Sequence, residues 1–466
     1  AYYYDFKEKE EKKIGDFGSF DISKDEKYIL FKNKKDYYVE KLDKKVDPKE
    51  GKIDLSNMEV YLDRLAEWRQ VFNESWRQMK YFFYDPGMHG VDWDATKTKY
   101  EVMLPHVRHR ADLTYIIGEM IGELNVGHAY VSGGDKPEVK DVPVGLLGAE
   151  FKYEDGAYKI TKIFEGRNWN SKTRSPLTEP GIEIKEGDYL LAIDGIELTE
   201  TMTPYKALVN KQAEFVTLLV NSSPSKDGAE EHHVKTIKSE SELRYYNWVE
   251  ERRRYVDSAT NGRIGYIHIP DMGFGHGLNE FVKYFYPQIR KEGLIIDDRY
   301  NGGGNVSSLI IERLRRELAF VEHIRNQQEV IMGTPDAAFT GPMVCLINEQ
   351  SMSDGDLFPY QFKMYDLGPV IGKKTWGGII GIRGSLPLLD GSSLHKPEFA
   401  NFSREGEWTV EGVGVEPDIE VDNHPYQEYI GNDQQLDRAI EEVLQLVEEY
   451  EGPKMPELPE NREKSK

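Results

Sequence analysis

The sequence has a single cysteine, Cys345, among 466 residues, so it can form no intramolecular disulfide and no cysteine-based metal centre. Its apolar runs, such as 215–220 and 343–347, stay far below the ~20 residues of a membrane-spanning helix. Basic residues are also in deficit, because 60 Lys and Arg stand against 82 Asp and Glu, a net charge of −22. We therefore expect neither nucleic acid nor an anionic membrane as partner, and a reducing, cytoplasmic location.

The N-terminus lacks an initiator methionine and the apolar region of a signal peptide, which predicts a processed product or a fragment. At roughly 150 residues per domain, the length indicates about three domains. The hydrophobic fraction of 39% fills several cores over this length, and 12% aromatic residues argue against disorder.

The order of patterns along the chain predicts a multidomain α/β protein. Residues 1–45 alternate short strands and turns, as in the last strands of a β-propeller or in an extra hairpin on the next domain. Apolar residues at spacings of three and four predict a helical domain over 55–135. Residues 140–240 predict a small β domain, and 241–450 alternate strands and helices around a mostly parallel sheet. The Pro-, Glu- and Lys-rich tail, 451–466, is predicted to be disordered.

The small β domain carries two recognisable stretches. A loop of Gly145, Leu146, Leu147 and Gly148 opens its first strand, and "EGDYLLAIDG" spans 186–195. Both resemble a PDZ domain. The resemblance implies that the amides of the Gly145–Gly148 loop bind a peptide carboxylate while the next strand edge pairs with the peptide. A generic small β domain is the alternative.

A glycine-rich loop follows an apolar strand at 297–305, with the sequence "DDRYNGGGN", and a helix comes after it. Glycines at such a junction let backbone amides face an anion. The loop matches neither a Walker nor a dinucleotide-binding pattern, and no lysine follows the glycines, which disfavours nucleotide binding. An oxyanion-binding loop and a tight structural turn remain as interpretations.

A second strand-to-helix junction contains "NEQSMSDGD" at 348–356. Ser353 lies near the predicted helix N-terminus, where the following amide can face a developing oxyanion. A helix-capping serine is the structural alternative, although Asp356 could cap the helix instead and leave Ser353 free. His128 follows Gly127 after a predicted helix, and Glu411 enters a glycine-rich turn. Taken alone, each of these last two is more typical of a structural or surface residue.

Together these stretches resemble the tricorn family of serine peptidases in the tail-specific clan, over nearly the whole chain. The most specific are "GHAY", "DDRYNGGGNVS", "NEQSMSDGD" and "EGVGVEPDIEV". The resemblance implies the end of a β-propeller, a helical domain, a PDZ domain and a crotonase-like α/β core domain. It also implies peptidase activity on oligopeptides or unfolded polypeptides, no cofactor or metal, and a homohexameric assembly.

The resemblance assigns a role to each candidate site residue. Ser353 matches the nucleophile, His128 the general base and Glu411 the acid of the charge network. The amides that would bind the oxyanion belong to Gly302, Gly303 and Asp354.

Two positions depart from related patterns. The family has a serine directly before the catalytic histidine, where this chain has Gly127. Carboxy-terminal processing peptidases use a Ser–Lys dyad, but the matching lysine position is Gly378 here, which favours a histidine base. The alternative functions are a catalytically weak or inactive peptide-binding PDZ scaffold on a crotonase-like fold, and an acyl-CoA enzyme of the crotonase type. The Ser353–Asp354 junction and the PDZ segment argue against the second.

Overall fold

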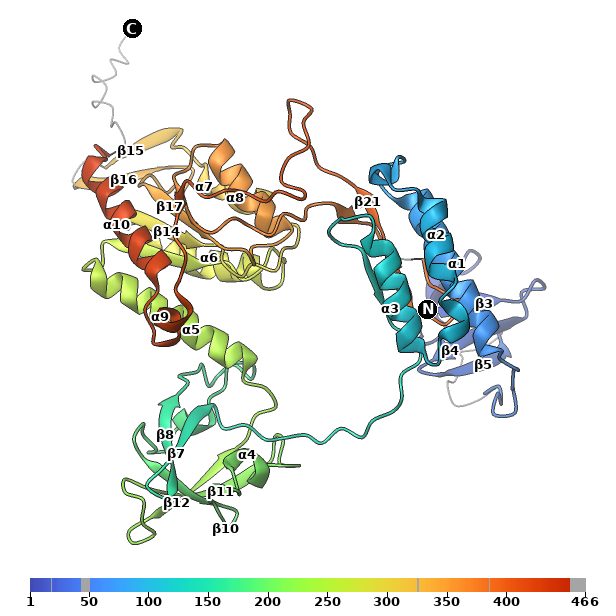
Figure 1. The fold of residues 1–466 in the computed structure, drawn as a ribbon, viewed down its shortest axis with the longest axis horizontal. Helices are drawn as coiled ribbons and strands as arrows, with labels where there is room; N and C mark the ends of the chain where they lie inside the picture. The colour runs from blue at the N-terminus through green and yellow to red at the C-terminus, as the bar shows by residue number, and fades with distance from the viewer. Residues whose placement is uncertain (18, 43–50, 325–326, 385, 453–466) are drawn as a thin grey trace. The chain divides into compact units, whose positions relative to one another are not determined.

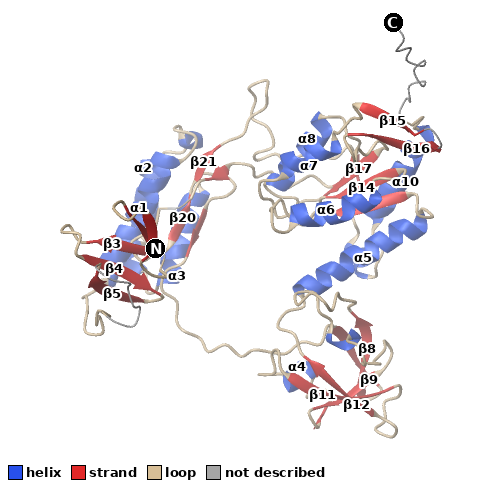
Figure 2. Cartoon of the chain, turned by 180° about the vertical axis from the view of Figure 1, so that it is seen from behind, coloured by secondary structure: helices blue, strands red, loops and turns tan. Residues whose placement is uncertain are grey.

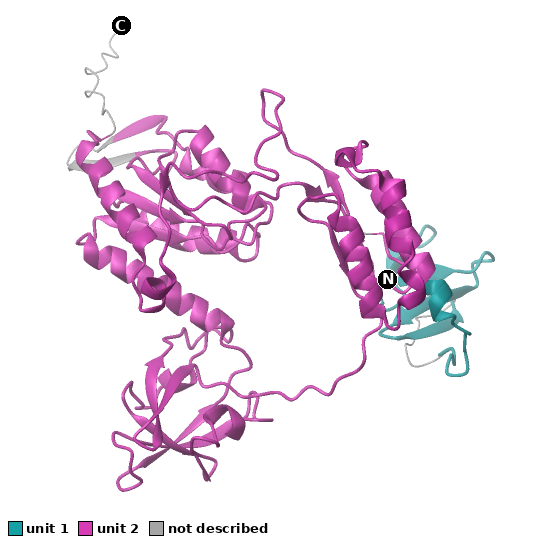
Figure 3. Cartoon of the chain, in the orientation of Figure 1, with its two compact units in different colours: residues 1–67 teal, residues 68–466 magenta. Residues whose placement is uncertain are grey.

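A computed structural model describes residues 1–17, 19–42, 51–324, 327–384 and 386–452 (Figure 1). The chain divides into two compact units, 1–67 and 68–466 (Figure 3), and each is described by itself below. Most of the predicted tail lies outside the described residues. No helix in the described ranges combines the length and apolar character needed to cross a bilayer.

The first unit is built from small antiparallel sheets. Its strands are β1 (Tyr2–Asp5), β2 (Glu10–Lys13), β3 (Ser19–Ile22), β4 (Tyr28–Asn33) and β5 (Asp36–Lys41), paired as β1–β2 and β3–β4–β5. Alternation along β4 buries Ile29 and Phe31 on one face, where Phe31 stacks on Tyr38. The opposite face exposes Tyr28 and Leu30, so apolar side chains occupy both faces.

The second unit begins with helices. They are α1 (Arg64–Phe82), η1 (Met88–Gly90), α2 (Trp93–Glu101), η2 (Leu104–His106) and α3 (Arg110–Gly122). Asp92 caps α2 by accepting the Ala95 amide at 2.9 Å, which satisfies one of the donors that a helix start leaves free. Phe72 of α1 and Ile117 of α3 are fully buried in one apolar cluster.

A segment from much later in the sequence joins this helical part (Figures 1 and 2). Strand β6 (Tyr130–Ser132) pairs with β20 (Ser393–His395), while β19 (Gly381–Ile382) pairs with β21 (Pro397–Phe399). Arg110 forms a buried ion pair with Asp390 at 2.6 Å. Residues 381–399 therefore connect the α/β part of the unit with the loop after α3.

The PDZ-like region forms one antiparallel sheet with the order β12–β11–β9–β8–β7. Its elements are β7 (Ala149–Glu154), β8 (Ala157–Ile163), η3 (Pro176–Thr178), β9 (Tyr189–Ile193), β10 (Ile196–Glu197), α4 (Pro204–Ala207), β11 (Phe215–Asn221) and β12 (Glu230–Lys235). The Asp194–Gly195 turn has positive φ at both residues, 49° and 75°, as a tight hairpin requires. The first strand after the glycine loop, β7, lies at the edge of the sheet.

The remaining residues form a parallel sheet covered by helices. Its strands, in the order β13–β14–β17–β18–β22, are β13 (Ile264–His268), β14 (Gly293–Asp297), β17 (Met343–Ile347), β18 (Val370–Gly372) and β22 (Ile419–Glu420). The helices are α5 (Ser241–Ala259), α6 (Gly277–Gln288), α7 (Ser307–Leu314), α8 (Asp354–Met364), α9 (Pro425–Tyr429) and α10 (Gln434–Glu449), and a hairpin of β15 (Phe320–Ile324) and β16 (Gln327–Thr334) is inserted. Every residue of β13, β14 and β17 is buried, as a parallel sheet covered on both faces requires.

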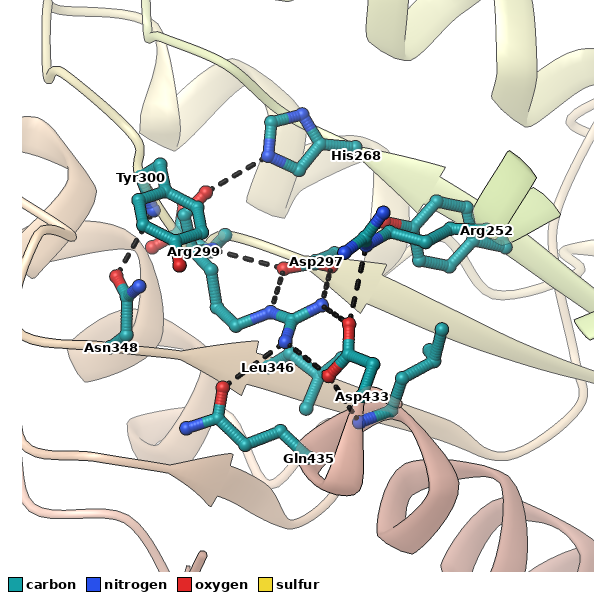
Figure 4. A network of polar contacts seen from close by, with 12 residues as sticks. Arg252, His268, Asp297, Arg299, Tyr300, Leu346, Asn348, Asp433 and Gln435 are labelled. Carbon is teal, nitrogen blue, oxygen red and sulfur yellow. Dashed lines mark hydrogen bonds and ion pairs between the residues drawn. The ribbon is translucent and has the colours of Figure 1, made fainter. Parts of the chain in front are cut away.

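A buried ionic network anchors the carboxyl end of β14 (Figure 4). The guanidinium of Arg299 donates to Asp297 at 2.6 and 2.9 Å and to Asp433 at 2.8 and 3.0 Å. Asp433 also caps α10 through the Leu436 amide and pairs with Arg252. The first half of "DDRYNGGGN" is thus a structural anchor at the end of β14.

Candidate active site

Ser353 occupies a sharp turn between β17 and α8. It directly precedes the first helical residue, is half-buried, and adopts a left-handed backbone with φ +60° and ψ −117°. Such a conformation costs a non-glycine residue on the order of 1–3 kcal/mol, so the surroundings must hold it. The carboxylate of Asp356 does so by accepting the Ser353 amide at 2.7 Å.

The glycine loop packs directly against this turn. A Cβ on Gly303 would lie 2.6 Å from the Cβ of Ser353 and 3.2 Å from the amide nitrogen of Asp354, and its φ is +80°. Only glycine fits both the conformation and the space. The Met352 amide donates to the carbonyl of Asn301 at 2.9 Å, which ties the two loops together.

The three amides predicted to bind the oxyanion differ in whether they already donate to an acceptor within the chain. Gly302 donates to the carbonyl of Pro270 at 3.1 Å, and Gly303 donates to Oδ1 of Asn301 at 2.9 Å. Within the described residues, the amide of Asp354 has no acceptor. Its carboxylate points to α7, where it accepts the amide of Ser307 at 2.9 Å. The donor next to Ser353 is therefore available, whereas both glycine amides are engaged inside the chain.

His128 lies in the loop between α3 and β6. It is half-buried with φ +61°, and its ring contacts that of Trp376 edge to face at 5.6 Å between centroids. Burial lowers the pKa of His128, while the negative charge of Glu411 acts in the opposite direction. A lowered pKa favours the neutral imidazole, the form that accepts a proton. Among the described residues, its buried Nδ1 has no hydrogen-bond partner.

Glu411 binds the residue before His128 through the backbone. Its Oε1 accepts the amide of Gly127 at 3.1 Å, and its Oε2 accepts the amides of Ile379 at 2.6 Å and Ile380 at 2.9 Å. A Cβ on Gly127 would lie 3.6 Å from Oε1 of Glu411, so a side chain at this position would face the carboxylate. The described structure contains no hydrogen bond between Glu411 and the imidazole of His128.

The segment 375–380 connects the two halves of the site. Asp356 accepts the amide of Gly377 at 2.7 Å and that of Gly378 at 3.3 Å, while Glu411 accepts the next two amides. Gly378, where Ser–Lys enzymes carry their base, thus supplies only a backbone donor. Sequence reasoning considered Asp356 only as a helix cap, although its place three residues after Ser353 at a helix start was a usable signal.

The structure therefore forms two groups of candidate residues. Ser353, Asp354 and Gly303 are in contact in one group. Glu411 meets the Gly127–His128 loop in the other. In the described part of the chain no hydrogen bond joins Ser353 to His128, and the link between the groups runs through residues 375–380.

Three of the four amides of the PDZ-like loop donate within the chain, whereas the amide of Leu147 has no acceptor among the described residues. Gly145 donates to the carbonyl of Leu208 at 2.9 Å, and Leu146 donates to that of Ile237 at 3.0 Å. Gly148 donates to Oε1 of Glu240 at 2.8 Å. The carboxylate of Glu240 thus already accepts the amide of Gly148, which lies directly before β7, the strand whose edge would pair with a peptide.

A strained serine at a strand-to-helix turn, an amide donor beside it and a glycine loop against it define the class of serine hydrolases with an α/β core. Three known domain families match the chain, in the same order as the helical, PDZ-like and α/β parts described above. Residues 64–122 match the "Tricorn protease C1 domain", 145–239 the "Tricorn protease PDZ domain", and 263–421 "Peptidase family S41".

Comparisons with individual proteins give the same result. The chain is 37% identical over 456 residues to the "Tricorn protease homolog" of Saccharolobus solfataricus, covering 95% of this chain and 41% of that protein. It is 34% identical over 451 residues to the "Tricorn protease" of Thermoplasma volcanium, covering 96% of this chain and 43% of that one. The crystal structure of the tricorn protease superposes with a TM-score of 0.85 at 31% identity, over 96% of this chain and 43% of that chain.

The resemblance to the C-terminal half of tricorn protease is therefore confirmed, with a mixed α/β fold that contains PDZ and S41 peptidase domains. The chain spans less than half the length of these relatives.

Proposed function

We propose that this chain is a serine peptidase that hydrolyses oligopeptides or unfolded polypeptides through Ser353, His128 and Glu411. One observation carries the proposal. Ser353 is held in a left-handed turn at the start of α8, next to the unoccupied amide of Asp354 and against Gly303. A plain helix cap requires neither this backbone strain nor a glycine loop pressed against it.

The proposed reaction is acyl transfer to water. His128 accepts the proton of Ser353 while Oγ attacks the carbonyl carbon of the scissile peptide bond, forming a tetrahedral oxyanion. His128 then gives the proton to the departing amine as the C–N bond breaks and an acyl-enzyme remains. Water attacks this ester with His128 again as base, which releases the acid and restores Ser353.

The oxyanion would be bound by the amide of Asp354 and by one amide of the glycine loop, Gly302 or Gly303. In other hydrolases one such donor contributes roughly 3–4 kcal/mol of transition-state stabilisation. Because Gly302 and Gly303 donate inside the chain here, the second donor must leave its internal acceptor when a substrate binds. The internal hydrogen bond that is given up is a neutral one worth about 1 kcal/mol net, and the hydrogen bond to the charged oxyanion that replaces it is stronger.

Glu411 acts on the base through the backbone in this proposal. It fixes the Gly127 amide, which sets the position of the following His128, and its charge favours the imidazolium that forms during attack. The family's serine at position 127 would place a hydroxyl toward the same carboxylate.

The finer parts of the assignment are proposals of the same kind. Apolar side chains on both faces of β4 support an origin in the last strands of a β-propeller, since such a strand lies between neighbouring blades. The parallel sheet and its glycine loop support the proposal that the α/β part is a crotonase-like core domain. Assembly into a homohexamer is proposed from the resemblance to tricorn protease alone.

Labelling with a serine-directed fluorophosphonate, followed by intact mass and peptide mapping, tests the proposal. We expect a single adduct on Ser353 that is lost in Ser353→Ala and strongly reduced in His128→Ala. Ser222→Ala, an exposed serine in the PDZ-like region, is the matched control and should label normally. Binding of peptides without any labelling or hydrolysis would favour the alternative, an inactive peptide-binding scaffold.

A further inference from the structure

Asp356 is a fully buried carboxylate that the proposed reaction steps do not use. Its Oδ2 accepts the amide of Ser353 at 2.7 Å and that of Gly378 at 3.3 Å, and its Oδ1 accepts the amide of Gly377 at 2.7 Å. The hydroxyl of Thr375 donates to it as well. Donors thus converge on it from the nucleophile turn and from a segment about twenty residues later.

That later segment, residues 375–380, is here called the strap. Four consecutive amides of the strap are bound by two carboxylates, because Asp356 accepts those of Gly377 and Gly378 and Glu411 accepts those of Ile379 and Ile380. The strap also pairs with the loop that carries Glu411, since Gly412 donates to the carbonyl of Gly377 at 2.8 Å.

These contacts form a continuous connection through the site. Starting at Ser353, it passes through Asp356 to the strap, through the strap to Glu411, and through Glu411 to the amide of Gly127 beside His128. In the described structure the nucleophile and the base share no direct hydrogen bond, and this path is a hydrogen-bonded connection between them.

We propose that Asp356 is a positioning residue of the peptidase reaction. It holds Ser353 in its left-handed conformation and fixes the strap that carries the Glu411–His128 side, and so keeps nucleophile and base in one geometry. The inference rests on the proposed function. The charge is required because a carboxylate offers acceptors only, whereas an asparagine would turn an NH2 group toward backbone donors.

Asp356→Asn in the full chain tests the inference, with Asp418→Asn as a control outside the site. Asp418 is exposed and ion-paired with Lys363, and it also accepts a backbone amide, that of Val370 at 2.9 Å, but within the described residues it has no hydrogen bond to the strap or to Ser353. We expect Asp356→Asn to lower kcat about 100-fold with KM within about threefold, since small misplacements of reacting groups cost that much. Fluorophosphonate labelling of Ser353 should slow by a similar factor, and the control should match wild type.

Hydrogen exchange separates positioning from general destabilisation. Peptides that cover the strap should lose protection in Asp356→Asn, while those covering β13, β14 and β17 keep it. Thr375→Val is the milder second variant should Asp356→Asn not fold. It removes the Thr375 hydroxyl, which donates to Asp356 and also accepts the amide of Val415 at 2.8 Å, and should lower kcat in the same direction by a smaller factor.

The outcomes are distinguishable from a failure of the proposed function. A folded Asp356→Asn with kcat within twofold of wild type and an unchanged strap overturns the inference while the peptidase assignment stands. A wild-type chain that neither labels nor hydrolyses overturns the proposed function, and unchanged exchange of the strap in the variant then overturns the positioning role as well.

Discussion

Glu411 and Gly127, which are 284 residues apart in sequence, are joined by a hydrogen bond from the glycine amide to Oε1 at 3.1 Å. Position 127, which makes this backbone contact, is the position at which the tricorn family has a serine before its catalytic histidine. The acid therefore reaches the His128 loop without a side chain at position 127.

Gly127→Ser should strengthen this connection. A Cβ at position 127 would lie 3.6 Å from Oε1 of Glu411, so the added hydroxyl can donate to the carboxylate, although Gly378 at 3.1 Å must give way slightly. A hydrogen bond to a charged group contributes about 1.5–3 kcal/mol at most, and we expect kcat to rise up to about tenfold. Gly127→Ala adds the carbon without the donor and should give no increase. An equal gain in both variants would contradict the hydroxyl's role.

Ser353→Ala, His128→Ala and the double variant should lose activity to a similar degree, about 10³-fold or more, because nucleophile and base act as a unit. Steady-state hydrolysis of an unstructured peptide measures this. Additive losses in the double variant would show that the two residues act independently.

The acid limb of kcat/KM should report the ionisation of His128. Because burial lowers its pKa below 6.5 and the reaction needs the neutral imidazole, activity should rise with pH through a pKa under about 6.5 and then level off. Glu411→Gln removes the charge that raises this pKa, so the limb should move to lower pH. A limb that moves upward in the variant would mean that another group titrates.

Arg299→Met should destabilise the α/β part strongly without touching the site. It leaves the carboxylates of Asp297 and Asp433 buried without their shared cation, a loss of about 3–5 kcal/mol in comparable cases. Thermal and denaturant unfolding measure the effect. Arg263→Met, which breaks exposed ion pairs with Glu292 and Glu448, is the control and should leave stability close to that of wild type.

The PDZ-like loop should not discriminate peptides by their carboxyl end. Glu240 is buried and occupies the Gly148 amide, and its second oxygen pairs with Arg244 at 2.8 Å. Fluorescence anisotropy with one peptide as free acid and as amide should give affinities within about twofold for wild type. Glu240→Ala frees the amide and should introduce a preference for the acid. A wild-type preference of about tenfold for the acid would show that the loop reads carboxylates despite Glu240.

Local patterns in the sequence predicted much of this architecture. The apolar run at 293–297 and the glycines after it indicated a buried strand and a close backbone approach, and Gly303 indeed packs against Ser353. The position of Ser353 between a strand and a helix was also predicted, because such a junction is a short-range feature, while its catalytic role stays a prediction. The engagement of the loop amides at Gly145 and Gly148 was not, since their acceptors belong to residues about sixty and ninety positions later.

The sequence by itself determined the order of elements and the need for glycine at the loop, because these follow from side-chain periodicity and backbone sterics, while the nucleophile candidate came from the family resemblance. Only the tertiary structure decided that Asp356 and Glu411 bind successive amides of residues 375–380, and that Glu411 meets the His128 loop. The physical reason is that every residue except proline has the same backbone amide. The sequence therefore carries no signal for which carboxylate an amide will bind, and the tertiary fold decides this.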